Sequence, residues 1–91
     1  MFRVDLATLL LYVAANVRRI RSKRGLTQEA LAEAVGVDLR FIQKVESGKA
    51  AVSLGTLAAL AEALGVKPGV LLKEAELPNP KRGRPKKAGS T

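Results

Sequence analysis

Four side chains within six positions of this chain have the chemistry to read the edges of nucleotide bases. Arg40 and Lys44 lie four residues apart, and Leu39 and Gln43 stand directly before them. On a helix, this spacing places all four on one face. Arginine and lysine suit guanine O6 and N7, glutamine suits adenine, and leucine can contact a thymine methyl group. The set predicts readout of a major groove, although a solvated helix face would explain any single member.

Two neighbouring residues fit contacts to phosphate. Gln28 opens the helical segment before this set, where its side-chain amide and the unpaired N–H groups of the first turn can hold a phosphate. An ordinary polar residue in a first turn is the alternative explanation. Lys49 lies in the loop after the set, and the next three residues of that loop are apolar. We therefore expect few phosphate contacts there beyond Lys49 and backbone amides.

These residues require two short helices joined by a tight turn, in a motif that spans residues 27–48. Thr27 is a good N-cap, and apolar residues recur at helical spacing after it up to Val35. Gly36 stands where a left-handed residue ends the first helix, and Asp38 can cap the second. Gly48 then ends the second helix. The polar face of the second helix points outward, as expected of an element that reads DNA.

The motif resembles the lambda-repressor-like helix-turn-helix family, also called the xenobiotic-response-element family. The matching residues are Gln28, Ala32, Gly36, Val37, Ile42, Val45, Glu46 and Gly48. The resemblance continues through residues 53–66 and 69–72, so it covers the chain from near residue 15 to residue 72. It implies an all-α, compact five-helix domain that binds double-stranded DNA as a homodimer. It also implies that Arg21 pairs with Glu46 and ties the first helix to the second motif helix.

An extended first helix is expected near residues 5–23. One narrow face of it carries the apolar residues Phe2, Leu6, Leu9, Leu10, Val13, Val17 and Ile20. Members of the resembled family generally begin near Ala15, so the residues before it are an extension that the resemblance does not explain. The uncharged run 6–17 is too short to span a bilayer and passes into a basic continuation of the helix, unlike a signal peptide. We expect no membrane partner and a cytoplasmic, nucleoid-associated protein.

Val4, Leu11 and Ala15 fall on the other side of this first helix, where they would be exposed in a monomer. Two explanations stay open, namely packing against the last helix of the same chain and a dimer contact. The resemblance adds the last helix as a second candidate for the dimer interface, through Val70 and Leu71. The sequence does not choose between the two interfaces.

Two further helices complete the domain. A fourth is expected after the cap Ser53, and a short fifth near residues 68–74. The core residues expected from the fourth helix are Leu54, Leu57, Leu60, Ala61 and Leu64, before Gly65. We expect residues 1–77 to form one DNA-binding domain and residues 78–91 to form a flexible basic tail.

Within the tail, residues 80–87 (PKRGRPKK) resemble the AT-hook motif around Arg82, Gly83, Arg84 and Pro85. Gly83 has no side chain to block approach to a groove floor, and Pro85 favours an extended chain. The two arginines suit the negative potential of a narrow A·T minor groove. A merely solvated or non-specific basic tail is the alternative explanation.

Charge and composition narrow the function classes. The 91-residue chain has a net charge of +8, with 11 Lys or Arg against 8 Asp or Glu in residues 1–77 and 5 against none in residues 78–91. This balance suits nucleic acid, although an acidic membrane surface would fit the charge alone. The chain has no Cys and no His, which removes disulfides, thiolate metal sites and the commonest general base. We expect neither an enzyme nor a metal or cofactor site.

These observations predict a transcriptional regulator, such as a repressor, that binds a palindromic operator as a homodimer. Its half-sites would lie about 10 to 10.5 base pairs apart. Small members of the resembled family include phage repressors, restriction-modification controllers and antitoxins. Two alternatives belong to other classes: an architectural protein that coats A·T-rich DNA, and an antitoxin-like module that holds a protein partner through its first helix.

Overall fold

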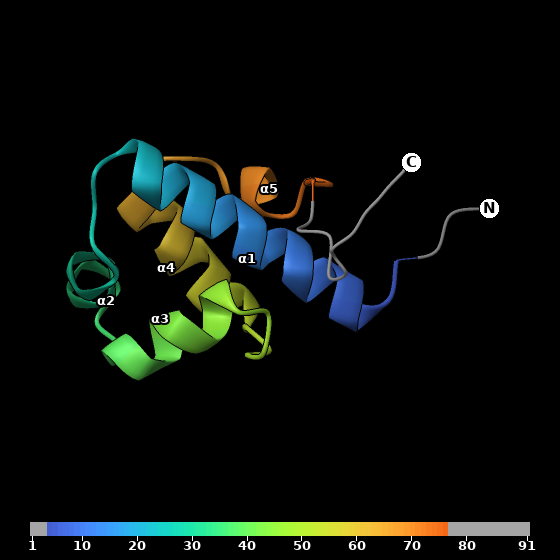
Figure 1. Ribbon diagram of the computed structural model, residues 1–91, viewed down its shortest axis with the longest axis horizontal. Coiled ribbons are helices and arrows are strands. Elements are labelled where there is room, and N and C mark those ends of the chain that lie inside the picture. The colour runs from blue at the N-terminus through green and yellow to red at the C-terminus, as the bar shows by residue number, and fades with distance from the viewer. Residues whose placement is uncertain (1–3, 77–91) are drawn as a thin grey trace, which may run out of the picture.

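The computed structural model describes residues 4–76, and these residues form α-helices without any strand. The helices are α1 (Leu6–Lys23), α2 (Gln28–Val35), α3 (Leu39–Glu46), α4 (Leu54–Leu64) and α5 (Pro68–Leu71). Figure 1 shows α1 crossing the whole domain, with α2 and α3 gathered toward its C-terminal half and α4 and α5 beside it. The predicted all-α, five-helix fold is confirmed.

The helix boundaries follow from capping residues in the sequence. The side chains of Asp5, Thr27 and Ser53 each accept a hydrogen bond from the backbone N–H three residues later, at 2.8, 2.9 and 3.0 Å. Gly36 and Gly65 end α2 and α4 with φ angles of 85° and 73°, which a residue with a Cβ adopts only under strain. The start of α1 therefore lies close to the predicted residue 5.

Two local predictions need correction. Asp38 occupies the N-cap position of α3, but its side chain makes no capping hydrogen bond. The fifth helix ends at Leu71, short of the predicted residue 74. Here the side-chain amide of Asn16 donates to the carbonyl oxygens of Leu71 and Lys73, at 3.0 and 2.9 Å. Because Asn16 of α1 binds these two carbonyls, residues 72–74 do not continue the helix.

One apolar cluster holds the helices together. It comprises Val13, Val17, Ile20, Leu31, Ala32, Ile42, Val45, Leu57, Leu60, Ala61, Leu64 and Leu71, all buried. Every described helix contributes at least one member, so each helix is held in place by its contacts with the others. Because the cluster takes nothing from α1 before Val13, the first two turns of α1 extend beyond it.

The extent of the core corrects three residue predictions. Leu6 and Leu54 were expected in the core, yet they are 62% and 80% exposed, because no described element reaches the start of α1 or the outer side of the first turn of α4. Leu71 was expected at a possible interface, but it is completely buried. Val4 and Leu11 are 54% and 40% exposed, so packing against α5 does not cover them.

None of the helices formed by residues 4–76 is long and apolar enough to cross a membrane.

Candidate nucleic-acid interface

The predicted reading residues share the outward face of α3. Arg40, Gln43 and Lys44 are exposed and Leu39 is half-buried, whereas Ile42 and Val45 on the inner face are buried. The N-terminal part of this face borders an open hollow of about 570 Å³, lined by Asp38, Leu39, Arg40 and Gln43. The face thus combines donors, acceptors and an apolar contact within the reach of one groove.

Asp38 is a member of this face that the sequence analysis assigned to capping. Asp38 lines the same hollow as Arg40 and Gln43. Its carboxylate makes no capping bond, so the carboxylate oxygens do not bind the N-terminus of α3. A carboxylate can accept a hydrogen bond from cytosine N4 and repels phosphate. The signal that would have found it is its position, one residue before the first predicted reading residue.

The inner end of α3 is anchored to α1 through an ion pair whose carboxylate is buried. Arg21 Nε lies 2.6 Å from Glu46 Oε2, and Arg21 Nη2 donates to Glu46 Oε1 at 3.1 Å. The Glu46 side chain is only 3% exposed. Arg21 Nη1 also donates to the carbonyl oxygen of Leu26, at 2.7 Å, so one guanidinium joins α1, the α1–α2 turn and α3. The predicted pair of Arg21 and Glu46 is confirmed.

Gln28 reaches the same carboxylate from α2. Its Nε2 donates to Glu46 Oε1 at 3.0 Å, and the residue is half-buried. No pattern in the sequence predicted this internal bond, which fixes the orientation of α2 against α3. A carboxamide carries a second N–H donor and a carbonyl oxygen. The phosphate contact of Gln28 and of the α2 N-terminus therefore stays a prediction.

Arg18 supports α3 from a third direction. Its Nη1 donates to the backbone carbonyl oxygen of Glu46, at the C-terminal end of α3. A cation is favourable at this position because the last carbonyls of a helix carry partial negative charge. From the sequence, Arg18 is only part of the basic continuation of the first helix. Arg18 instead caps another helix, which only the tertiary structure reveals.

The loop after α3 runs directly against α1. Gly48 has a φ of 75°, which favours glycine. A Cβ on it would lie 2.8 Å from Leu11 Cδ2, so the loop is in close contact with the Leu11 side chain. The N–H of Lys49 donates to the carbonyl oxygen of Lys44, at 2.9 Å, and the Lys49 side chain is exposed. Lys49 thus lies just after the end of α3 and is open to solvent, and both are needed for a contact with a phosphate beside the groove.

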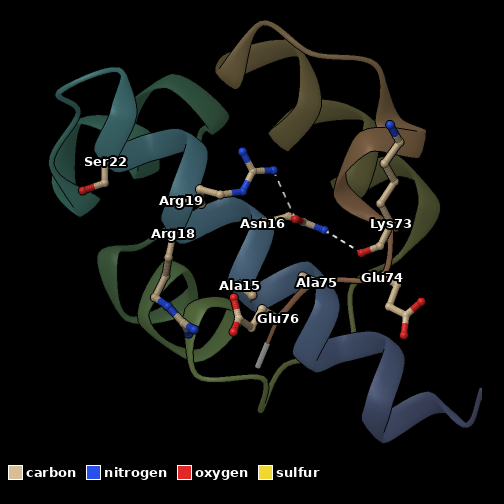
Figure 2. Close-up of a pocket in the computed structure, with 9 residues that line it drawn as sticks. All are labelled: Ala15, Asn16, Arg18, Arg19, Ser22, Lys73, Glu74, Ala75 and Glu76. Carbon is tan, nitrogen blue, oxygen red and sulfur yellow. Dashed lines mark hydrogen bonds between the residues drawn. The ribbon is translucent and has the colours of Figure 1, made fainter. Parts of the chain in front are cut away.

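A second hollow, of about 640 Å³, lies between α1 and residues 73–76 (Figure 2). Its floor contains the buried Asn16, whose amide holds Leu71 and Lys73 as described above. Asn16 Oδ1 in turn accepts from Arg19 Nη2 at 3.3 Å, so its donors and its acceptor are all engaged (Figure 2). The hydrogen bonds of Asn16 stabilise the fold and leave nothing directed at a ligand.

Residues 4–76 contain no group of three or more His, Asp or Glu side chains placed to hold a metal ion. The four AT-hook-like residues Arg82, Gly83, Arg84 and Pro85 lie outside the described residues, as does Phe2.

Comparison with known proteins agrees with this geometry. The sequence profile of the helix-turn-helix family HTH_3 matches residues 17–71. The chain belongs to this family. The lambda-repressor-like fold and the motif at α2 and α3 are therefore those of a DNA-binding domain, while residues 6–16, about the first three turns of α1, precede the matched part.

Individual relatives show the same likeness, although the chain spans less than half the length of the first curated relatives that it matches. The chain is 40% identical over 67 residues to control protein C.SmaI of Serratia marcescens, which covers 74% of this chain and 80% of that one. It is 34% identical over 64 residues to the uncharacterized HTH-type transcriptional regulator y4aM of Sinorhizobium fredii, covering 70% of this chain but only 45% of the relative. The restriction-modification controller protein C.AhdI from Aeromonas hydrophila has a similar structure, with a TM-score of 0.66 and 37% identity over 68% of this chain and 94% of that one.

Proposed function

We propose that this protein is a transcriptional regulator that binds operator DNA sequence-specifically, with α3 in the major groove. The observation that carries the proposal is the contrast between the two sides of α3. Its outer face presents Arg40, Gln43 and Lys44 to solvent, while Glu46 at its inner end is fixed by bonds from α1 and α2. A reading helix needs such support, because base contacts tolerate little misplacement. The named functions of the relatives support the same conclusion.

The residue types divide into readers and anchors. Arg40 and Lys44 suit guanine, Gln43 suits adenine and Leu39 suits the thymine methyl group, so these residues carry sequence preference. Gln28 with the N-terminus of α2, and Lys49 after α3, suit phosphate and set the orientation of the domain on the duplex.

The length of α3 favours a homodimer on a palindromic operator. Eight residues of helix are about 12 Å long, which corresponds to only about four base pairs along the groove. One copy therefore reads too few bases to select an operator from a genome. Two copies related by a two-fold axis read two half-sites, about 10 to 10.5 base pairs apart.

The tail adds a second mode of contact in this proposal. Arg82 and Arg84 enter an adjacent A·T-rich minor groove, while Gly83 and Pro85 keep the chain slim and extended there. The five cations of residues 78–91 also contribute salt-dependent attraction to phosphate, which compensates for the mostly apolar loop after Lys49.

Selection of DNA from a random pool tests the proposal. The full chain is compared with its double variant Arg82→Ala, Arg84→Ala at about 150 mM salt, where binding through phosphate alone is suppressed. We expect the same palindrome from both proteins and a flanking A·T preference only from the unaltered chain. Binding without any enriched half-site would indicate an architectural protein instead. No DNA binding, together with co-purification of another protein, would indicate an antitoxin-like interaction module.

A further inference from the structure

The N-terminal part of α1 is rich in leucine and carries no charged side chain after its N-cap Asp5 until Arg18. It projects past the other helices (Figure 1). We define the α1 patch as Val4, Leu6, Leu9, Leu10 and Leu11. Three of these are exposed and the other two are half-buried, in contrast to the buried residues that follow on the same helix. An exposed apolar patch of this kind marks an interaction site, so the patch requires a cover.

The other described elements do not supply that cover. The described helices leave Leu6 more than half exposed. Residues 78–91 contain no Leu, Ile, Val, Met or Phe, and they carry five cations. Such a segment cannot bury an apolar surface of this kind. The described residues and the tail 78–91 therefore leave the patch open to another molecule.

We propose that the α1 patch packs against the same patch of a second copy of this chain. Residues 6–17 contain no charged side chain, and Asp5, the N-cap of α1, is the one charged residue within the span of the patch. The seam through Leu6, Leu9 and Leu10 therefore brings no basic side chains into contact, although each copy carries a net charge of +8. Leu6, Leu9 and Leu10 have the i, i+3, i+4 spacing that forms a helix-packing seam. A two-fold axis across this seam makes the contact self-complementary, as a closed dimer requires.

The position of the patch suits a DNA-binding dimer, and this inference rests on the proposed function. Leu11 lies against Gly48, just after α3, whereas Arg40 and Lys44 project from the outer face of α3. A partner at the patch therefore leaves the reading face uncovered. Fifteen residues of continuous helix, about 22 Å, separate Leu6 from Arg21, which anchors α3. The dimer contact and the α3 anchor thus lie on one rigid element that sets the distance between the two reading helices.

The test is the mass of the full chain in solution, measured by sedimentation equilibrium over a range of concentrations. Leu6→Glu places a charge in the proposed seam at a position that is exposed in the monomer, so folding is retained. Leu54→Glu is the matched control, because Leu54 is an exposed leucine on α4 outside the patch. Val70→Glu tests the rival interface on α5. Circular dichroism verifies that all four proteins are helical.

We expect a dimer for the unaltered chain and for Leu54→Glu, and dimerisation weakened on the order of 100-fold for Leu6→Glu. Equal dimerisation of Leu6→Glu and the unaltered chain would overturn the inference. So would an equal loss in Leu54→Glu, or a loss confined to folded Val70→Glu, although the homodimer itself would stand in both cases.

A chain that stays monomeric even on a selected palindrome would overturn the inference and the homodimer together. Enrichment of single half-sites in the DNA selection would still leave the sequence-specific reader intact. The two proposals therefore fail in distinguishable ways.

Discussion

Arg18 donates a hydrogen bond to the backbone carbonyl oxygen of Glu46, while Arg21, one turn further along α1, binds the carboxylate of the same residue. One residue of α3 is thus held through its main chain and through its side chain by a single neighbouring helix. Because the main-chain bond does not depend on the identity of the acceptor residue, the two arginines make separable contributions.

Replacing Arg18 with methionine should lower the free energy of unfolding by about 1 to 2 kcal/mol, because a charge-assisted hydrogen bond is lost while the aliphatic stem is kept. DNA affinity should fall as well, since the end of α3 is less fixed. Urea denaturation and a DNA titration measure the two effects. Lys23→Met removes the same charge from an exposed position of α1 and is expected to change stability less.

Glu46→Ala should lower the free energy of unfolding by about 3 to 5 kcal/mol, because it leaves Arg21 without its buried partner and also frees Gln28. Chemical denaturation measures this loss. Glu33→Ala removes a carboxylate from an exposed position of the neighbouring helix α2 and serves as the control. Similar stability losses in the two variants would show that the network around Glu46 contributes little.

The two N-caps of the motif should respond differently to alanine. Thr27→Ala removes a capping bond and should cost about 1 kcal/mol of stability. Asp38→Ala removes no such bond, so we expect a smaller cost together with a changed base preference next to the Leu39 contact. Thermal unfolding and DNA selection with both variants separate these effects. A large stability loss in Asp38→Ala would contradict the uncapped geometry.

Arg40→Ala and Lys49→Ala should weaken DNA binding in different ways. The first should cost about 1 to 3 kcal/mol on the operator and relax preference at one base pair. The second should weaken binding evenly across sequences and reduce the slope of log affinity against log salt by about 1. Titrations of operator and scrambled DNA at several salt concentrations distinguish a base contact from a phosphate contact.

The start of α1 should loosen in acid. The hydrogen bond from the Thr8 N–H to Asp5 holds the pKa of the Asp5 carboxyl below its ordinary value of 3.8. A lowered folded-state pKa stabilises the fold at pH values above 3.8, and this contribution is lost as the pH falls through the folded-state value. The helical signal of α1 should decline there. Asp5→Asn keeps a capping oxygen without a titrating proton, so the decline should be absent in that variant.

Sequence reasoning captured the features that depend on local chemistry. Capping residues located the starts of α2 and α4, hydrophobic periodicity located the start of α1, and glycines located the ends of α2 and α4. The pairing of Arg21 with Glu46 followed from the family resemblance. Periodicity correctly separated the outer from the inner face of α3, because the period of a helix fixes which residues lie together.

The features that were not predicted depend on contacts between residues that lie far apart in the sequence. Periodicity placed Leu6 on the core face of α1, but it cannot tell where along the helix the neighbouring elements end. The bonds from Arg18 and Gln28 to Glu46 join residues 28 and 18 positions apart, which no local pattern encodes. The early end of α5 follows from Asn16, 55 positions before Leu71.

Asn16 binds the main-chain carbonyls of Leu71 and Lys73 and no side chain of residues 71–73, so these two hydrogen bonds do not depend on the side chains at those positions. Substitutions at positions 72–76 can therefore accumulate without moving the path of the backbone. The backbone therefore leaves the domain at a fixed position after Lys73. A different C-terminal segment could be joined there without a change in the position of α3.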